Sequence, residues 1–86
     1  MNELDDKSQA FFDFNQLKPF DKVLVRYSRF SVWRPAFFHS YRPESRYYPF
    51  QTINNQGESF TQCVPYEGNE YLMGTTQEAS PYYKFE

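Results

Sequence analysis

Short runs of alternating apolar and polar residues, separated by turn-forming residues, restrict this chain to a small β-structure. The clearest run is Lys22–Tyr27, in which Val23, Val25 and Tyr27 share one face of an extended strand. An alternation of this kind, with a period of two residues, indicates a strand rather than a helix. We therefore expect a mostly β fold with little helix.

The clearest turn is Asn54–Gly57, because Gly57 is free to adopt a positive φ. Strand-like segments lie on both sides of it, Tyr47–Ile53 before and Glu58–Val64 after. So short a connection between two strands predicts an antiparallel hairpin.

Two further strands are expected, one over Val32–Tyr41 and a short closing one over Glu70–Met73. Pro35 interrupts the first of these, and proline cannot donate a hydrogen bond to a central ladder. This strand must therefore either lie at a sheet edge or carry a bulge at Pro35. A single 3₁₀ turn is expected at Pro65–Asn69.

Five short strands with tight connections are typical of a small barrel. We predict a five-stranded antiparallel SH3-like or Tudor-like barrel over residues 17–76, with an acidic arm, flexible or partly helical, over residues 1–16. The rings of residues 77–86 are expected to pack on the barrel. An OB-fold fits less well, because it normally places a helix between its third and fourth strands.

The core has to be built largely from rings, since aromatic residues make up 22% of this 86-residue chain. A chain this short has room for a single core only. Each predicted core residue falls on the apolar face of its strand or in the closing strand: Val23, Val25, Phe38, Phe60, Val64 and Leu72.

Composition also excludes several classes of protein. No apolar run approaches the roughly 18 residues of a membrane span, so no membrane partner is expected. Met1–Asp6 carries acids where a secretory signal needs basic and apolar residues, which predicts a cytoplasmic location. A single cysteine forms no internal disulfide, and with a single histidine it cannot complete a tetrahedral zinc site.

Catalytic residues are missing from the pattern as well. His39 is the one imidazole, and Cys63 alternates with Gln62 and Val64 as a small core residue would. The acids are dispersed and the glycines lie too far apart for a phosphate-binding loop. We therefore expect no enzyme activity, no cofactor and no metal.

Positive charge is concentrated in the middle of the chain. Residues 18–46 carry a net charge of +5, although the whole chain carries −2. The same segment is rich in aromatic rings, and cations mixed with rings are typical of proteins that bind single-stranded nucleic acid. Arg and Tyr that alternate on the exposed faces of strands would give the same pattern.

Several stretches resemble a family of small uncharacterised proteins found in gut anaerobes, their phages and mobile elements. The resemblance rests on Lys18–Arg26, Trp33, Phe37-Phe38 and the pattern Pro-Tyr-x-x-Asn-Glu-x-Leu-x-Gly-Thr-Thr at Pro65–Thr76. It implies no activity. This chain departs from the family at residues 27–30, where members often have an acid-rich turn, and at residues 42–46, where theirs is shorter and less basic.

A looser resemblance is to Tudor-like barrels, in which a strand beginning with Trp follows the first strand. In those domains rings form a cage for methylated Lys or Arg through cation–π contact. The rings that would form such a cage here are Tyr27, Trp33, Tyr48 and Tyr66. Alternatively, Trp33 covers one open end of the barrel.

These observations favour a non-catalytic binding module or adaptor that contacts a protein partner through the first hairpin, since Tyr, Trp and Arg are enriched at interface hot spots. A single-stranded nucleic acid as ligand, or a structural or accessory role, are the alternatives. The candidate contact residues are Arg26, Tyr27, Arg29, Trp33, Arg34, Arg42, Arg46, Tyr48 and Tyr66.

Overall fold

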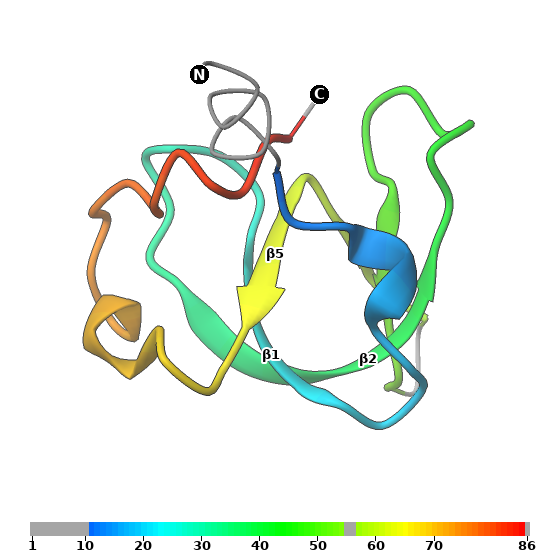
Figure 1. The fold of residues 1–86 in the computed structure, drawn as a ribbon, viewed down its shortest axis with the longest axis horizontal. Helices are drawn as coiled ribbons and strands as arrows, with labels where there is room; N and C mark the ends of the chain where they lie inside the picture. Colours follow the sequence, from blue (N-terminus) through cyan, green and yellow to red (C-terminus); the bar gives the residue numbers. More distant parts are fainter. Residues whose placement is uncertain (1–10, 55–56, 86) are drawn as a thin grey trace, which may run out of the picture.

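The computed structural model describes residues 11–54 and 57–85 (Figure 1). Within them lie five strands, β1 (Lys22–Arg26), β2 (Arg34–Tyr41), β3 (Phe50–Thr52), β4 (Ser59–Phe60) and β5 (Gln62–Pro65), and two single-turn 3₁₀ helices, η1 (Phe14–Gln16) and η2 (Glu70–Leu72). None of these helices is long and apolar enough to cross a membrane. The prediction of a mostly β domain with a five-stranded antiparallel sheet is confirmed.

The strands lie in the order β4-β3-β2-β1-β5, and each pairing between named strands is antiparallel. β1 is an interior strand, with Leu24 opposite Pro35 of β2 on one side and opposite Val64 of β5 on the other. Figure 1 shows β2 curving from its contact with β1 toward β3. No ladder between β4 and β5 is found among the described residues, so the sheet is not closed by strand pairing.

The chain itself connects the two edges of the sheet. The predicted strand Glu58–Val64 is divided at Thr61, and its two parts pair with different partners, β4 with β3 and β5 with β1. The Thr61 hydroxyl donates to the backbone carbonyls of Arg26 and Tyr27. This bend carries residues 59–65 from one edge of the sheet to the other.

Pro35 lies in the part of β2 that pairs with β1 alone, and the register shift of β2 falls later, between Phe38 and Ser40. Of the two interpretations offered for Pro35, an edge position or a bulge at the proline, the structure supports the edge. The backbone N–H of Ile53 donates to the carbonyl of Phe37 at 2.9 Å. In an extended strand, the backbone groups of residues two positions apart point to the same side. The backbone of Pro35 therefore points to the same side of β2 as that of Phe37, the side of β3, but at a place that β3 does not reach.

The prediction of a closing strand over Glu70–Met73 is wrong. Glu70–Leu72 forms η2, held by the N–H of Leu72 bonded to the carbonyl of Asn69 at 2.9 Å. A four-residue segment with three apolar residues does not distinguish a strand from one helical turn, and local hydrogen bonds decide the conformation here. Met73 makes only an isolated parallel bridge to Trp33. The 3₁₀ turn expected at Pro65–Asn69 is therefore displaced to Glu70–Leu72.

The core lies on both faces of β1 and β5. The inner cluster, on the face of Val23 and Val25, consists of Phe14, Val23, Val25, Phe38, Phe50, Phe60 and Cys63. The outer cluster, on the opposite face, consists of Leu24, Trp33, Val64 and Leu72. All six predicted core residues are buried, which confirms that prediction.

The two ends of the described chain meet beside these clusters. The N–H of Phe12 donates to the carbonyl of Tyr82 at 2.9 Å, and Tyr83 and Phe85 pack against both clusters. The helix considered for the arm falls largely outside the described residues. Its last residues form η1, where the Asp13 carboxylate accepts from the N–H of Asn15 at 2.9 Å.

Candidate functional site

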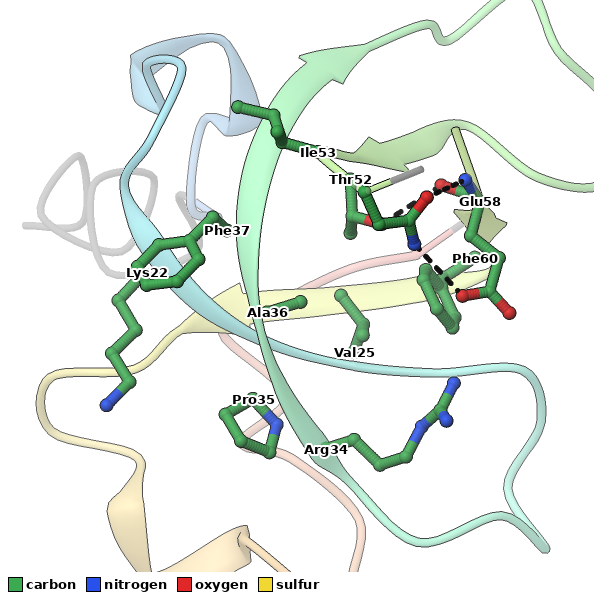
Figure 2. A pocket seen from close by; sticks show the side chains of 11 residues that line it. Lys22, Val25, Arg34, Pro35, Ala36, Phe37, Thr52, Ile53, Glu58 and Phe60 are labelled. Atoms are coloured by element: carbon green, nitrogen blue, oxygen red, sulfur yellow. Dashed lines mark hydrogen bonds between the residues drawn. The ribbon is translucent and has the colours of Figure 1, made fainter. Parts of the chain in front are cut away.

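An apolar hollow of about 620 Å³ lies beside β2; we call it the β2 groove (Figure 2). β1 contributes Lys22 and Val25, β2 contributes Arg34–Phe37, and the β3–β4 hairpin contributes the remaining lining residues. These are Thr52, Ile53, Asn54, Glu58 and Phe60. Its volume falls in the range of ligand-binding clefts in proteins.

The groove exists because β2 changes partners along its length. Its first half pairs with β1, and its second half pairs with β3 from Phe38 onward. β3 ends at Thr52, so the strand beside Pro35 is missing and apolar side chains line the gap. The ring of Phe37 is 51% exposed, which makes it the most accessible large apolar group of the groove.

One corner of the groove holds a cation against two rings. The guanidinium carbon of Arg34 lies 5.5 Å from the ring centre of Phe60 and 5.8 Å from that of Tyr27. The two rings are themselves in contact, with centroids 4.6 Å apart. Figure 2 shows Arg34 reaching from β2 toward Glu58 and Phe60, whereas Lys22 and Phe37 lie on the other side of β2.

Glu58 fixes the same corner through two partners. It accepts a hydrogen bond from the Tyr27 hydroxyl, and Asn54 binds both its carboxylate and its backbone N–H at 3.1 Å. The hydrogen bond to Glu58 is the main cause of the raised pKa of Tyr27, and burial raises this pKa further. The phenol therefore stays a neutral donor across the physiological range.

Arg26 and Trp33, two of the candidate contact residues, are each only 1% exposed. The Arg26 guanidinium lies 4.4 Å from the Trp33 ring centre. It donates to Gln62 Oε1 at 2.8 Å, to the carbonyls of Thr76 at 3.0 Å and of Arg29 and Ser31 at 3.5 Å, and pairs with Glu78 at 3.4 Å. Neither residue can contribute to an exposed contact surface in this structure.

The buried cation has a clear physical basis. Burial lowers the pKa of Arg26 from its usual value, and the Glu78 carboxylate acts in the opposite direction. A guanidinium stays charged in proteins, so its buried N–H groups must all find acceptors. Trp33, whose indole N–H donates to the carbonyl of Gln77 at 2.8 Å, covers the outer cluster. Trp33 is therefore a buried core residue and not an accessible cage ring.

The other candidate residues divide into separate groups. Tyr27 and Arg34 form the groove corner, and Arg29 lies at the exposed hairpin tip, 5.4 Å from the Phe30 ring centre. Arg42, Arg46 and Tyr48 belong to the connection between β2 and β3, where Tyr48 contacts Tyr47. Tyr66 lies under the ammonium of Lys22, at 4.1 Å. The four proposed cage rings thus have different partners.

Sequence reasoning missed the groove residues Pro35, Phe37 and Ile53 as a surface. A signal was available, because adjacent residues of a strand point to opposite faces, so of Phe37 and Phe38 only one can enter the core.

A second missed feature is Phe20, which is 73% exposed and has a φ of 76°. A side chain other than glycine is strained in this conformation.

The described residues contain no group of three His, Cys, Asp or Glu side chains arranged to hold a metal ion. Cys63 is fully buried, and burial strongly raises the pKa of its thiol. A thiol in that state is a poor nucleophile. His39 is exposed and its Nδ1 contacts the Ser40 hydroxyl at 2.9 Å.

No family model, curated protein or solved structure matches this chain.

Proposed function

We propose that this domain is a non-catalytic binding module, and that an extended segment of a protein partner occupies the β2 groove. The observation that carries the proposal is an apolar hollow of about 620 Å³ beside a half-exposed phenylalanine. Exposed apolar surface of this kind marks interaction sites on small domains.

The fold supports this proposal. The strand order β4-β3-β2-β1-β5, with β4 and β5 separated by Thr61 alone, is that expected of an SH3-like barrel closed by one bent strand. We therefore include such a barrel in the proposal. The unpaired side of β2 at Pro35 leaves room for an extended chain, because β3 has already ended.

The chemistry of the lining favours a peptide over other ligands. Phe37, Pro35 and Ile53 offer pockets for apolar side chains, and Arg34 offers a planar donor for a carboxylate or carbonyl. Arg34 already lies on two rings, so its side chain is held in place before binding. Pre-ordered Arg and aromatic groups are the usual anchors of protein interfaces.

The test is selection of a displayed library of random peptides on the immobilised domain, followed by titration of the enriched peptide. A Phe37→Ser variant should bind that peptide with an affinity at least about tenfold lower, since hot-spot truncations have effects of this size. Phe30→Ser is the matched control, because Phe30 is also exposed but lies at the hairpin tip away from the groove lining. Failure to enrich any peptide, or equal loss with both variants, would contradict the proposal.

A further inference from the structure

The connection between β2 and β3, residues 42–49, forms a second exposed surface that the β2 groove does not include; we call it the β2–β3 loop. It projects from the sheet at the upper right of Figure 1, in green. Its base is closed by the N–H of Arg42 bonded to the carbonyl of Pro49 at 2.6 Å. A further bond, from the N–H of Ser45 to the carbonyl of Arg42 at 2.9 Å, shapes its turn. The loop is thus an ordered projection.

Two adjacent rings of this loop face outward. Tyr47 is 68% exposed and Tyr48 is 50% exposed, with ring centres 6.5 Å apart. The guanidinium carbon of Arg46 lies 5.8 Å from the Tyr47 ring centre. Two exposed neighbouring rings offer faces on which planar groups can stack.

A polar hollow of about 230 Å³ lies between the loop and the C-terminal segment. Arg46 and Tyr47 line it from the loop, and Lys84 lines it from the C-terminal segment. Ser45 and Gln62 add polar groups to its wall. Glu44 is in the same loop but does not line this hollow.

Two cations line this hollow, Arg46 and Lys84, and a third, Arg42, lies at the base of the loop. Within residues 11–54 and 57–85, the one ion pair joins Arg26 to Glu78. Arg42, Arg46 and Lys84 therefore have no carboxylate within salt-bridge distance in that part of the chain. Arg42 directs its Nε toward the Ser40 hydroxyl at 3.3 Å, a neutral partner.

We propose that the β2–β3 loop binds single-stranded nucleic acid, with phosphates on Arg42, Arg46 and Lys84 and bases stacked on Tyr47 and Tyr48. Unpaired cations that follow a backbone, together with rings that accept any base, are the elements of such sites. A protein partner fits less well here, because the hollow is polar whereas the β2 groove supplies the apolar pockets. This surface is independent of the proposed peptide site, so the failure of one leaves the other standing.

The test is fluorescence anisotropy with a labelled oligothymidine of about 12 nucleotides, within the length that small barrels cover. Three phosphate contacts predict a slope of about −2 in a plot of log affinity against log salt, since each contact on a single strand adds about −0.7. Affinity should then fall about 20-fold between roughly 50 and 200 mM salt. A duplex of equal length should bind more weakly, because its bases cannot stack on the rings.

Two double variants separate charge from stacking. Arg42→Gln with Arg46→Gln should reduce the salt slope to about −0.7, the value for one remaining contact. Tyr47→Ala with Tyr48→Ala should leave that slope unchanged while it weakens binding by about tenfold or more. The matched control is Arg29→Gln with Phe30→Ala, an exposed cation and ring at the hairpin tip that should bind as the parent does.

Three results would overturn the proposal. One is no anisotropy change at about 100 μM protein in low salt. This concentration matches the weakest dissociation constants of non-specific contacts at physiological salt, and low salt tightens such contacts further. Another is a Tyr47→Ala, Tyr48→Ala variant that binds as tightly as the parent. The third is a loop variant that no longer binds the groove-selected peptide but binds the oligonucleotide as the parent does. That result would identify the loop as a contact for protein instead.

Discussion

The two faces of β1 are both buried, but different kinds of contact bury them. On the inner face Val23 and Val25 meet rings of the sheet and of η1, such as Phe38, Phe60 and Phe14. On the outer face Leu24 and Arg26 meet Trp33 and residues that follow β5 in the chain. The inner face is held by apolar packing, whereas the outer face depends on a charged group with defined acceptors. The two faces should therefore respond differently to substitution.

The largest effect is expected on the inner face. Phe60→Ala should lower the free energy of unfolding by about 3 to 5 kcal/mol, because it removes a fully buried ring and leaves a cavity. Urea denaturation measures this directly. Phe30→Ala, which removes an exposed ring, is the control and should change stability by less than about 0.5 kcal/mol. A Phe60→Ala variant as stable as the parent would show that the inner cluster is not the main source of stability.

A smaller loss is expected when the buried cation of the outer face is removed. Arg26→Met retains much of the side-chain volume but leaves the carbonyl of Thr76 and the amide oxygen of Gln62 without their donor. We expect a loss of about 1 to 3 kcal/mol, the range for polar groups that lose a partly buried hydrogen-bond partner. The exposed Arg29→Met is the matched control. If Arg26→Met instead stabilises the domain, the cation serves specificity rather than stability.

Trp33→Phe should cost about 1 to 2 kcal/mol. It loses the indole N–H bond to the carbonyl of Gln77 and part of the surface on which Arg26 lies. Thermal unfolding followed by circular dichroism would measure the change. An effect as large as that of Phe60→Ala would mean that the outer face contributes as much as the inner one.

The smallest effect is expected for Glu78→Gln, below about 0.5 kcal/mol. The Glu78 side chain is 70% exposed, so its pair with Arg26 is screened by water although the cation is not. Comparison of Glu78→Gln with Arg26→Met in one denaturation series tests whether the carbonyls, rather than the ion pair, hold Arg26. Equal losses in the two variants would show that the ion pair dominates.

The inner face could be predicted from sequence because it follows a local rule. The alternation in Lys22–Tyr27 is enough to identify β1 and the burial of Val23 and Val25, since it depends only on neighbouring residues. The same rule failed at Glu70–Met73, where four residues are too few to separate a strand from a 3₁₀ turn.

The outer face could not be predicted because its determinants lie far apart in the sequence. Nothing local to Arg26 distinguishes it from the exposed Arg29, and its burial depends on acceptors at Gln62 and Thr76. The β2 groove was missed for a similar reason. It results from the point at which β2 leaves β1 and β3 ends, which is a property of the sheet and not of a single segment.

The bonds of Arg26 also determine when this domain can finish folding. They connect it to residues 36, 50 and 52 positions later in the chain, so the outer face cannot form while that later part is absent. Contacts of such long sequence separation require large loops to close before any energy is gained, and domains dominated by them fold in milliseconds to seconds. We therefore expect that, in a chain leaving the ribosome, the outer face of β1 stays exposed until Thr76–Glu78 has emerged. The first strand to be synthesised thus depends on the C-terminal segment to complete its packing.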